Sequence, residues 1–224
     1  MFVGALCGNK FSMTVAQRCA TLPRMASTPS RRLPCEIDAP LKDGRWVCLR
    51  TIRPSDEERI RDGIEAMSER SRYLRFFSAF RTPPDSIVKR LSAVDGHDHI
   101  GWGAILLDGR EYPPIAAAHA IRLDDKPGTG ELAVAVLDEY QGLGIARMLV
   151  AAVLADCAEE DLCCLEMQVL GENRAAAALL LGLGAEVVGT QGSVDTFVLD
   201  ARAALARLRA EPQPPGLAAV LAEL

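Results

Sequence analysis

Three features are missing from this sequence of 224 residues, and each absence excludes a class of protein. No apolar run approaches the roughly 18 residues that a helix needs to cross a bilayer, which argues against a membrane span. No C-x-x-C pair occurs among the seven cysteines, so the usual ligand spacing of a zinc site is missing. We therefore expect no metal, and we expect a cytoplasmic protein whose cysteines stay reduced.

Acidic side chains are also missing from residues 1–35, which contain five of the 25 basic residues. The remaining 189 residues therefore hold 20 basic and 30 acidic side chains, a net charge of −10. An acidic body disfavours nucleic acid, which is bound by neutralising its phosphates, and mildly favours a cationic partner. We expect residues 1–39 to form a disordered extension; an organellar transit peptide, or a true start at Met13 or Met25, is the alternative.

Apolar spacing after residue 39 predicts a single α/β domain over residues 40–200. Strands are predicted at 46–53, 100–107, 115–123, 131–137, 165–170, 185–189 and 196–199. Helices are predicted to begin at Pro54, Ser68, Thr82, Gly142 and Asn173. The stretch 132–136 (LAVAV) is apolar at every position, so its strand is expected to be central and buried. Residues 201–224 are expected to form a C-terminal helical tail that prolines interrupt.

A glycine-containing turn, residues 141–146 (QGLGIA), lies between that central strand and the next helix. Glycine lets a ligand approach the backbone, and the first N–H groups of a helix are unpaired, so such a turn suits a pyrophosphate. The turn is not a P-loop, which needs G-x-x-x-x-G-K-[ST]. It is not a dinucleotide fingerprint either, because Arg147 stands where a third small residue is required. A helix start without a ligand is the alternative from the motif alone.

The pattern Q-x-x-G-x-A at 141–146 resembles the pyrophosphate-binding motif of the GCN5-related N-acetyltransferase (GNAT) superfamily, Q/R-x-x-G-x-G/A. The similarity extends over about residues 45–200. Residues 49–56 resemble the family's opening strand and turn, and residues 170–185 resemble its late segment. Residues 67–77 resemble the corresponding helix of bacterial protein lysine acetyltransferases. The resemblance implies an α/β GNAT fold, with a mixed, mostly antiparallel central sheet that is splayed at the cofactor site and flanked by helices.

The resemblance also implies a site for acetyl-CoA. The central strand's backbone would hold the pantetheine arm and the acetyl carbonyl, the N–H groups of the turn would bind the pyrophosphate, and an asparagine would lie near the thiol. The expected cofactor-binding residues are Val134, Ala135, Val136, Gln141, Gly142, Leu143, Gly144, Ile145, Ala146, Arg147 and Asn173.

The implied reaction is direct transfer of the acetyl group from acetyl-CoA to a primary amine, with a protein lysine favoured over a small-molecule amine. Glu131 matches the family's general-base glutamate; the alternative is a strand-end carboxylate paired with Arg122. Leu180 stands where the family often has a tyrosine that protonates the leaving thiolate, and leucine cannot donate a proton. This departure makes a non-catalytic acyl-CoA-binding regulatory module the rival. The oligomeric state, monomer or homodimer, stays open.

Other polar residues receive structural interpretations. His119 lies within a strand and is expected to be a hydrogen-bonded structural histidine, and residues 95–99 (DGHDH) are expected to form a solvated turn. The basic face formed by Arg70, Arg72 and Arg75 is expected to be solvated. Tyr73 and Tyr140 are the nearest alternatives in type to the missing acid.

Overall fold

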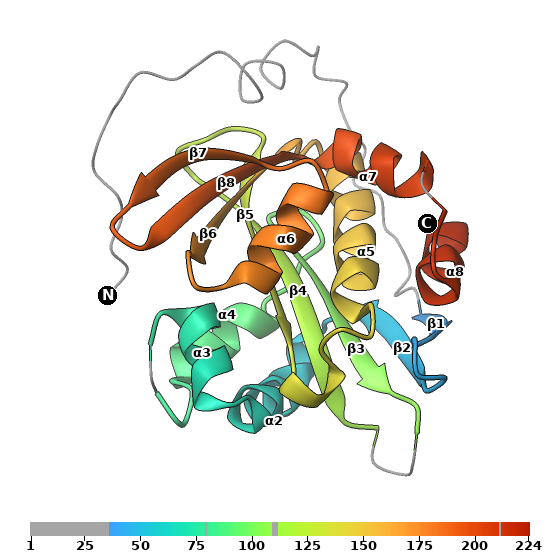
Figure 1. Cartoon of the computed structure of the whole chain (residues 1–224). Coiled ribbons are helices and arrows are strands. Elements are labelled where there is room, and N and C mark those ends of the chain that lie inside the picture. Colours follow the sequence, from blue (N-terminus) through green and yellow to red (C-terminus); the bar gives the residue numbers. More distant parts are fainter. Residues whose placement is uncertain (1–35, 79, 109–111, 211) are drawn as a thin grey trace.

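Eight strands form one mixed sheet in the computed structural model, which describes residues 36–224 except 79, 109–111 and 211 (Figure 1). The strands are β1 (Glu36–Pro40), β2 (Trp46–Thr51), β3 (His99–Leu106), β4 (Pro114–Arg122), β5 (Thr129–Val136), β6 (Cys164–Leu170), β7 (Glu186–Gln191) and β8 (Val194–Asp200). Their order is β1-β2-β3-β4-β5-β6-β8-β7, and every neighbouring pair is antiparallel except β5 and β6. The predicted mixed, mostly antiparallel sheet is confirmed.

Helices cover both faces of this sheet (Figure 1). The α-helices are α2 (Glu57–Ala66), α3 (Glu69–Phe76), α4 (Asp85–Ser92), α5 (Ile145–Glu159), α6 (Arg174–Gly182), α7 (Ala201–Ala210) and α8 (Pro215–Glu223), with 3-10 turns η1 (Pro54–Asp56) and η2 (Asp138–Tyr140). Helix α5 packs on β3, β4 and β5, while α2 contacts β4 and α3 contacts β5. Successive strand side chains point to opposite faces, so Ala118 joins the core beside α5 and Ala117 faces α2.

Helix α5 lies at the centre of the main core. Its apolar residues face every direction because β3, β4 and β5 lie on one side of it and α7 and α8 on the other. Trp102 of β3 is 1% exposed, and its indole Nε1–H donates to Asp156 Oδ2 of α5 at 2.7 Å. The buried ring therefore keeps a hydrogen-bond partner, which removes the cost of burying its polar atom.

Both predicted domain boundaries need correction. The boundary after residue 39 is wrong, because Glu36–Pro40 forms edge strand β1, paired with β2 along its whole length. Residues 1–35 of the predicted extension lie outside the described residues. The predicted C-terminal tail is an integral part of the domain: α7 and α8 pack on α5, and Leu217 and Val220 are 3% and 0% exposed. Pro215, counted as a helix breaker, is the first residue of α8, a position where proline is well tolerated.

Candidate active site

Neighbouring strands β5 and β6 diverge and leave a fork in the sheet. Strands β5 and β6 pair over three positions only, Thr129 with Cys164, Gly130 with Leu165, and Glu131 with Glu166. Beyond this point β5 continues to Val136 beside β4, and β6 continues to Leu170 beside β8. Backbone groups of residues 132–136 that point away from β4 therefore have no strand to bond, so the fork can accept the polar groups of an extended ligand. The predicted splay of the sheet is confirmed.

The predicted glycine turn lies at the open end of this fork, where β5 leads through η2 into α5. Gly142 and Gly144 have φ angles of +75° and +98°, which glycine adopts without strain. Within the described part of the chain, the N–H groups of residues 142–146 have no backbone acceptor, whereas the Met148 N–H donates to the Gly144 oxygen at 3.3 Å. Successive free N–H groups at a helix start form a concave anion site.

Contacts on both sides hold this turn in place. The Gln141 side-chain amide donates to the Val136 carbonyl at 3.2 Å, which fastens the turn to the end of β5. Asp138 of η2 accepts hydrogen bonds from the Ser68 N–H and from the Ser68 and Ser71 hydroxyls, at 3.1, 2.9 and 2.8 Å. Burial alone would raise the pKa of Asp138, but these hydrogen bonds outweigh it and lower the pKa. The turn and helix α3 are thereby joined.

Lys42, in the β1–β2 hairpin, also lies beside the turn, a contact that the sequence analysis did not predict. Its N–H donates to the Leu143 oxygen at 3.4 Å, and its Cε lies 3.9 Å from the position that a Cβ on Gly144 would occupy. No salt bridge joins Lys42 to a residue that the structure describes. The exposed ammonium is therefore available to an anion held by the turn.

Glu131 is the last residue of β5 that pairs with β6, at the point of the fork, and its side chain is exposed. The alternative pair with Arg122 is not formed. Ile121 is the β4 residue opposite Glu131, and Arg122 is opposite Gly130. The Arg122 Nε lies 3.2 Å from Asp98 Oδ1 instead. Its guanidinium also donates to the Glu160 carbonyl at 3.0 Å. The Glu131 carboxylate therefore has no salt bridge among the described residues and faces solvent at the fork.

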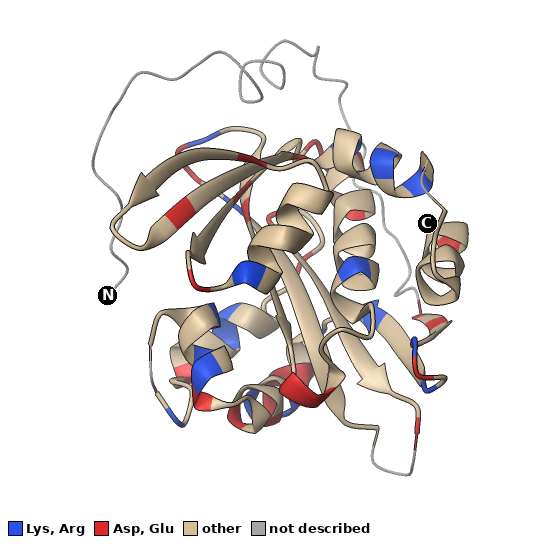
Figure 2. Ribbon diagram, in the orientation of Figure 1, with Lys and Arg blue, Asp and Glu red and all other residues tan. Residues whose placement is uncertain are grey.

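The prediction that the basic face of α3 is solvated is correct for Arg70 and wrong for Arg72 and Arg75. Arg70 is 72% exposed, but Arg72 is buried and donates to the carbonyls of Glu65 and Met67. Arg75 turns toward the sheet, where its guanidinium lies 4.9 Å from the centre of the Phe76 ring. Burial lowers the pKa of Arg75, and the Glu131 carboxylate acts against this shift. Figure 2 shows the basic residues of α3 near the acidic turn η2.

His119 and His99 form a buried hydrogen-bonded pair on the same sheet face. His99 Nδ1 lies 3.1 Å from the Ala93 carbonyl, and His99 Nε2 lies 2.9 Å from His119 Nδ1. A carbonyl only accepts, so we assign the protons to His99 Nδ1 and His119 Nδ1, which leaves the His119 Nε2 lone pair unprotonated. Burial, and then the charges of Arg75 and His99, lower the pKa of His119 well below its usual value. This environment agrees with the predicted structural role and keeps the ring neutral near pH 7.

The loop at 95–99 forms a hydrogen-bonded turn. Asp95 Oδ1 accepts from the N–H groups of His97, Asp98 and His99, each at 2.9 Å, and His97 Nδ1 lies 2.7 Å from Glu160 Oε2. Across the described residues, no group of three or more potential ligands could hold a metal ion. In the same part of the chain, no helix is long and apolar enough to span a membrane.

Asn173 and Leu180 border the other side of the fork. Asn173 caps α6, because its Oδ1 accepts from the Ala176 N–H at 3.2 Å, and its side-chain NH₂ group is not used by this cap. Leu180 is 5% exposed and belongs to the core, so this position supplies no proton donor.

Two tyrosines are the alternatives in type to the missing acid. Tyr140 points to the β1–β2 hairpin, with Arg45 at 4.7 Å from its ring centre, while Tyr73 on α3 is 42% exposed.

Comparisons with known proteins agree with this geometry. The model of the acetyltransferase (GNAT) family matches residues 64–185. Acetyltransferase Pat of Mycolicibacterium smegmatis is 32% identical over 149 residues, which cover 66% of this chain and 44% of that protein. The crystal structure of the GNAT domain of S. lividans PAT is 26% identical with a TM-score of 0.66, over 74% of this chain and 96% of that one.

A more distant structure shows the same fold with its ligand present. Spermidine N-acetyltransferase from Vibrio cholerae, solved in complex with CoA and spermine, is 16% identical with a TM-score of 0.55, over 71% of this chain and 98% of that one. Our chain spans less than half of the length of the M. smegmatis relative. The family model nevertheless matches more than half of the chain, and the sheet has the expected fork, so the chain belongs to the GNAT family of acetyltransferases.

Proposed function

We propose that this acetyltransferase moves the acetyl group of acetyl-CoA directly to the ε-amine of a protein lysine. The observation that carries the proposal is the fork between β5 and β6, with free N–H groups at its open end and an exposed carboxylate at its closed end. An extended amide-bearing thioester with a pyrophosphate would meet complementary groups along this whole path.

The donor would be bound mainly by backbone groups. The N–H groups of the turn would receive the pyrophosphate, and the backbone of β5 would hold the pantetheine arm and the acyl carbonyl. Asn173 would contribute its free side-chain NH₂ group near the thiol. The site residues in this proposal are Val134, Ala135, Val136, Gln141, Gly142, Leu143, Gly144, Ile145, Ala146, Arg147 and Asn173. Because backbone dipoles do this binding, an acidic protein can hold an anionic donor.

The reaction needs one proton acceptor and one thiolate leaving group. The acceptor amine has a pKa near 10, so it must lose a proton before its nitrogen can attack the thioester carbon. Glu131 would take this proton, directly or through one water. The C–N bond then forms as the C–S bond breaks, the nitrogen gives its second proton to water, and the CoA thiolate takes a proton from water, since Leu180 has none to give.

Two features support a lysine in a protein as the acceptor. Residues 67–77 resemble bacterial protein lysine acetyltransferases, and they form the connection from α2 to α3 and α3 itself, which contacts β5 next to the fork. The net charge of −10 outside residues 1–35 favours a cationic partner.

An acceptor screen tests the proposal. CoA release would be measured with the full chain and acetyl-CoA, using lysine-containing peptides, polyamines and free amino acids as acceptors. Matched peptides with N-acetylated lysine are the control for hydrolysis of the thioester. We expect lysine peptides to give the highest kcat/KM. Higher turnover with polyamines or amino acids would replace the protein lysine with a small amine, and CoA release without any acceptor dependence would contradict amine transfer.

A further inference from the structure

A cavity of about 90 Å³ lies between helices α2 and α3 and the sheet face opposite α5. Its floor includes Gly103, Ala117 and Ala135, which are in register across β3, β4 and β5. Gly63, in the interior of α2, forms part of the roof. Glycine is unfavourable inside a helix, so a small residue at this position maintains space at a cost in stability. Two glycines and two alanines therefore surround the cavity.

This cavity adjoins the strand that would hold the acyl carbonyl. Ala135 belongs to the segment of β5 assigned to the thioester, and its side chain lines the cavity. A water-sized group needs roughly 10–15 Å³ by the same measure, so the methyl group of an acetyl would leave most of the space empty. The cavity thus has room for an acyl chain longer than acetyl, an inference that rests on the proposed function.

The charged side chains around the cavity are arginines, with one exception. Arg50 is paired with Asp56 at 2.7 Å, and Arg59 donates to the Tyr112 carbonyl at 2.9 Å. Arg75 has neither a salt bridge nor a hydrogen bond to any residue that the structure describes. A lysine ammonium would be repelled by this lining, so the cavity is not suited to the acceptor side chain.

The guanidinium of Arg75 lines the cavity, is only partly exposed and forms no ion pair with a described residue, so it is available to bind an anion. The Glu131 carboxylate interacts electrostatically with Arg75 but forms no salt bridge with it. The guanidinium is the group that binds carboxylates best, because its N–H donors match the two oxygens. The apolar part of the lining, which includes Ile64, Met67 and Phe76, suits methylene groups.

We propose that this cavity is an acyl subsite for CoA thioesters that end in a carboxylate, such as the succinyl group, and that Arg75 binds the carboxylate. The chemistry is unchanged from acetyl transfer. The amine nitrogen bonds to the thioester carbon, the C–S bond breaks, the amine proton goes to Glu131, and CoA leaves as a thiol after protonation by water. The product is an amide that carries a free carboxylate.

Calorimetric titration of the full chain with three donors tests the subsite. Acetyl-CoA measures the shared part of the site. Butyryl-CoA and succinyl-CoA both carry a four-carbon acyl chain, and only the second ends in a carboxylate. We expect succinyl-CoA to bind at least about 10-fold tighter than butyryl-CoA, as for a charged hydrogen bond in a partly buried site. Mass spectrometry of a lysine peptide then identifies which acyl group is transferred.

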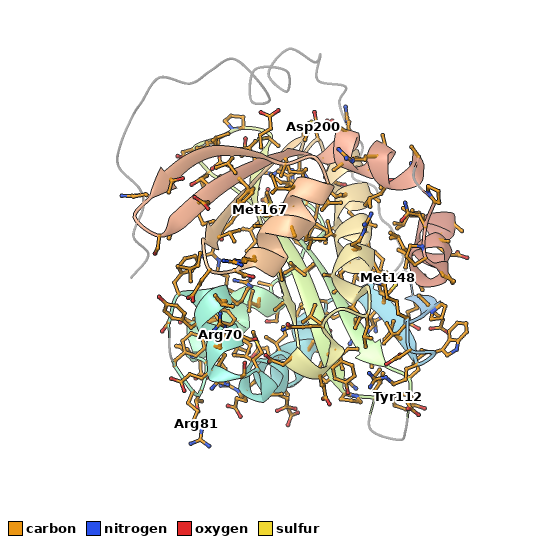
Figure 3. All side chains as sticks on the ribbon, viewed as in Figure 1. Arg70, Arg81, Tyr112, Met148, Met167 and Asp200 are labelled. Carbon is orange, nitrogen blue, oxygen red and sulfur yellow. The ribbon has the colours of Figure 1, made fainter. Side chains whose placement is uncertain are left out.

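Variants assign the preference to Arg75. Arg75→Gln is expected to reduce the succinyl-over-butyryl preference about 10-fold or more, and Arg75→Lys to keep part of it. Arg81→Gln is the matched control, because Figure 3 shows Arg81 pointing away from the body of the protein, and it should keep the wild-type preference. The wild-type comparison stands even where Arg75→Gln fails to fold.

Three results would overturn the proposal. Wild-type protein that binds succinyl-CoA no tighter than butyryl-CoA has no carboxylate subsite. A preference that survives in folded Arg75→Gln does not come from Arg75. Binding of acetyl-CoA without any gain for succinyl-CoA removes only this inference, whereas failure of all three donors to bind also removes the proposed function.

Discussion

The two faces of strands β3, β4 and β5 differ sharply, although they share one backbone. Toward α5 the strands present Trp102, Ala118 and Leu132, which are at most 4% exposed and belong to the main core. Toward α2 and α3 the same strands present Gly103, Ala117 and Ala135 around a cavity, with His119 and Glu131 beside them. Alternate residues of one strand therefore serve packing and chemistry, and substitutions should separate stability from activity by face.

The largest expected effect is on the packed face. Leu149→Ala would empty a site in α5 that is 0% exposed and should cost about 2–5 kcal/mol of unfolding free energy. For a protein of this size each kcal/mol lowers Tm by about 2–4 °C. Differential scanning calorimetry measures the shift, with Leu181→Ala, at a side chain that is 53% exposed, as the control. Equal shifts for the two variants would mean that α5 is not the centre of the core.

On the open face, Glu131→Gln should reduce kcat/KM about 100-fold or more and leave Tm unchanged. The amide keeps the shape of the side chain and removes its ability to accept a proton from the acceptor amine. Initial rates over a range of pH measure the loss, and Glu186→Gln on exposed strand β7 is the matched control. If Glu131→Gln retains full kcat/KM at every pH, another group is the base.

The histidine pair should make the open face a source of pH-dependent stability. The pKa values of His119 and His99 are both lowered, chiefly by burial, so below about pH 6.5 the unfolded chain binds protons that the folded protein does not. Stability is therefore present above pH 6.5 and is lost as pH falls, by up to about 1.4 kcal/mol per pH unit for each histidine. Urea unfolding at pH 7, 6 and 5 gives the unfolding free energy at each pH, which should change less with pH for His119→Gln than for the wild type. The same pH dependence for both proteins would show that His119 protonates freely in the folded state.

The smallest expected effect lies at the turn, which belongs to neither face. Lys42→Ala should weaken acetyl-CoA binding by about fivefold at low salt, and less as salt screens the ammonium. The loss should disappear for pantetheine, which has no pyrophosphate. Lys89→Ala on α4 is the control, and a similar loss for both variants would indicate a general charge effect instead of a contact at the turn.

Local patterns predicted the parts of this fold that local sequence determines. The apolar run at 132–136 and the following glycines placed the central strand, the turn and α5 correctly, because each depends on residues close in sequence. The resemblance to GNAT proteins supplied the fork, which no periodicity could have shown.

Contacts between segments that are distant in the sequence were not predicted. Arg75 was assigned to a solvated face because charge spacing on a helix cannot distinguish solvent from a cavity. Lys42 precedes the turn by about a hundred residues, and only the contact of the β1–β2 hairpin with the turn brings the two together. The role of α8 likewise depends on β1, at the opposite end of the domain.

The fork has a consequence for solubility. Beyond Glu131, strands β5 and β6 each present an unpaired backbone edge in the middle of the sheet. Such edges are templates for pairing with another chain, and proteins usually cover or interrupt them. A donor bound between the strands would cover these edges, so it would reduce aggregation as well as serve as a substrate. Protein stripped of its donor should therefore be the form most prone to associate through this seam.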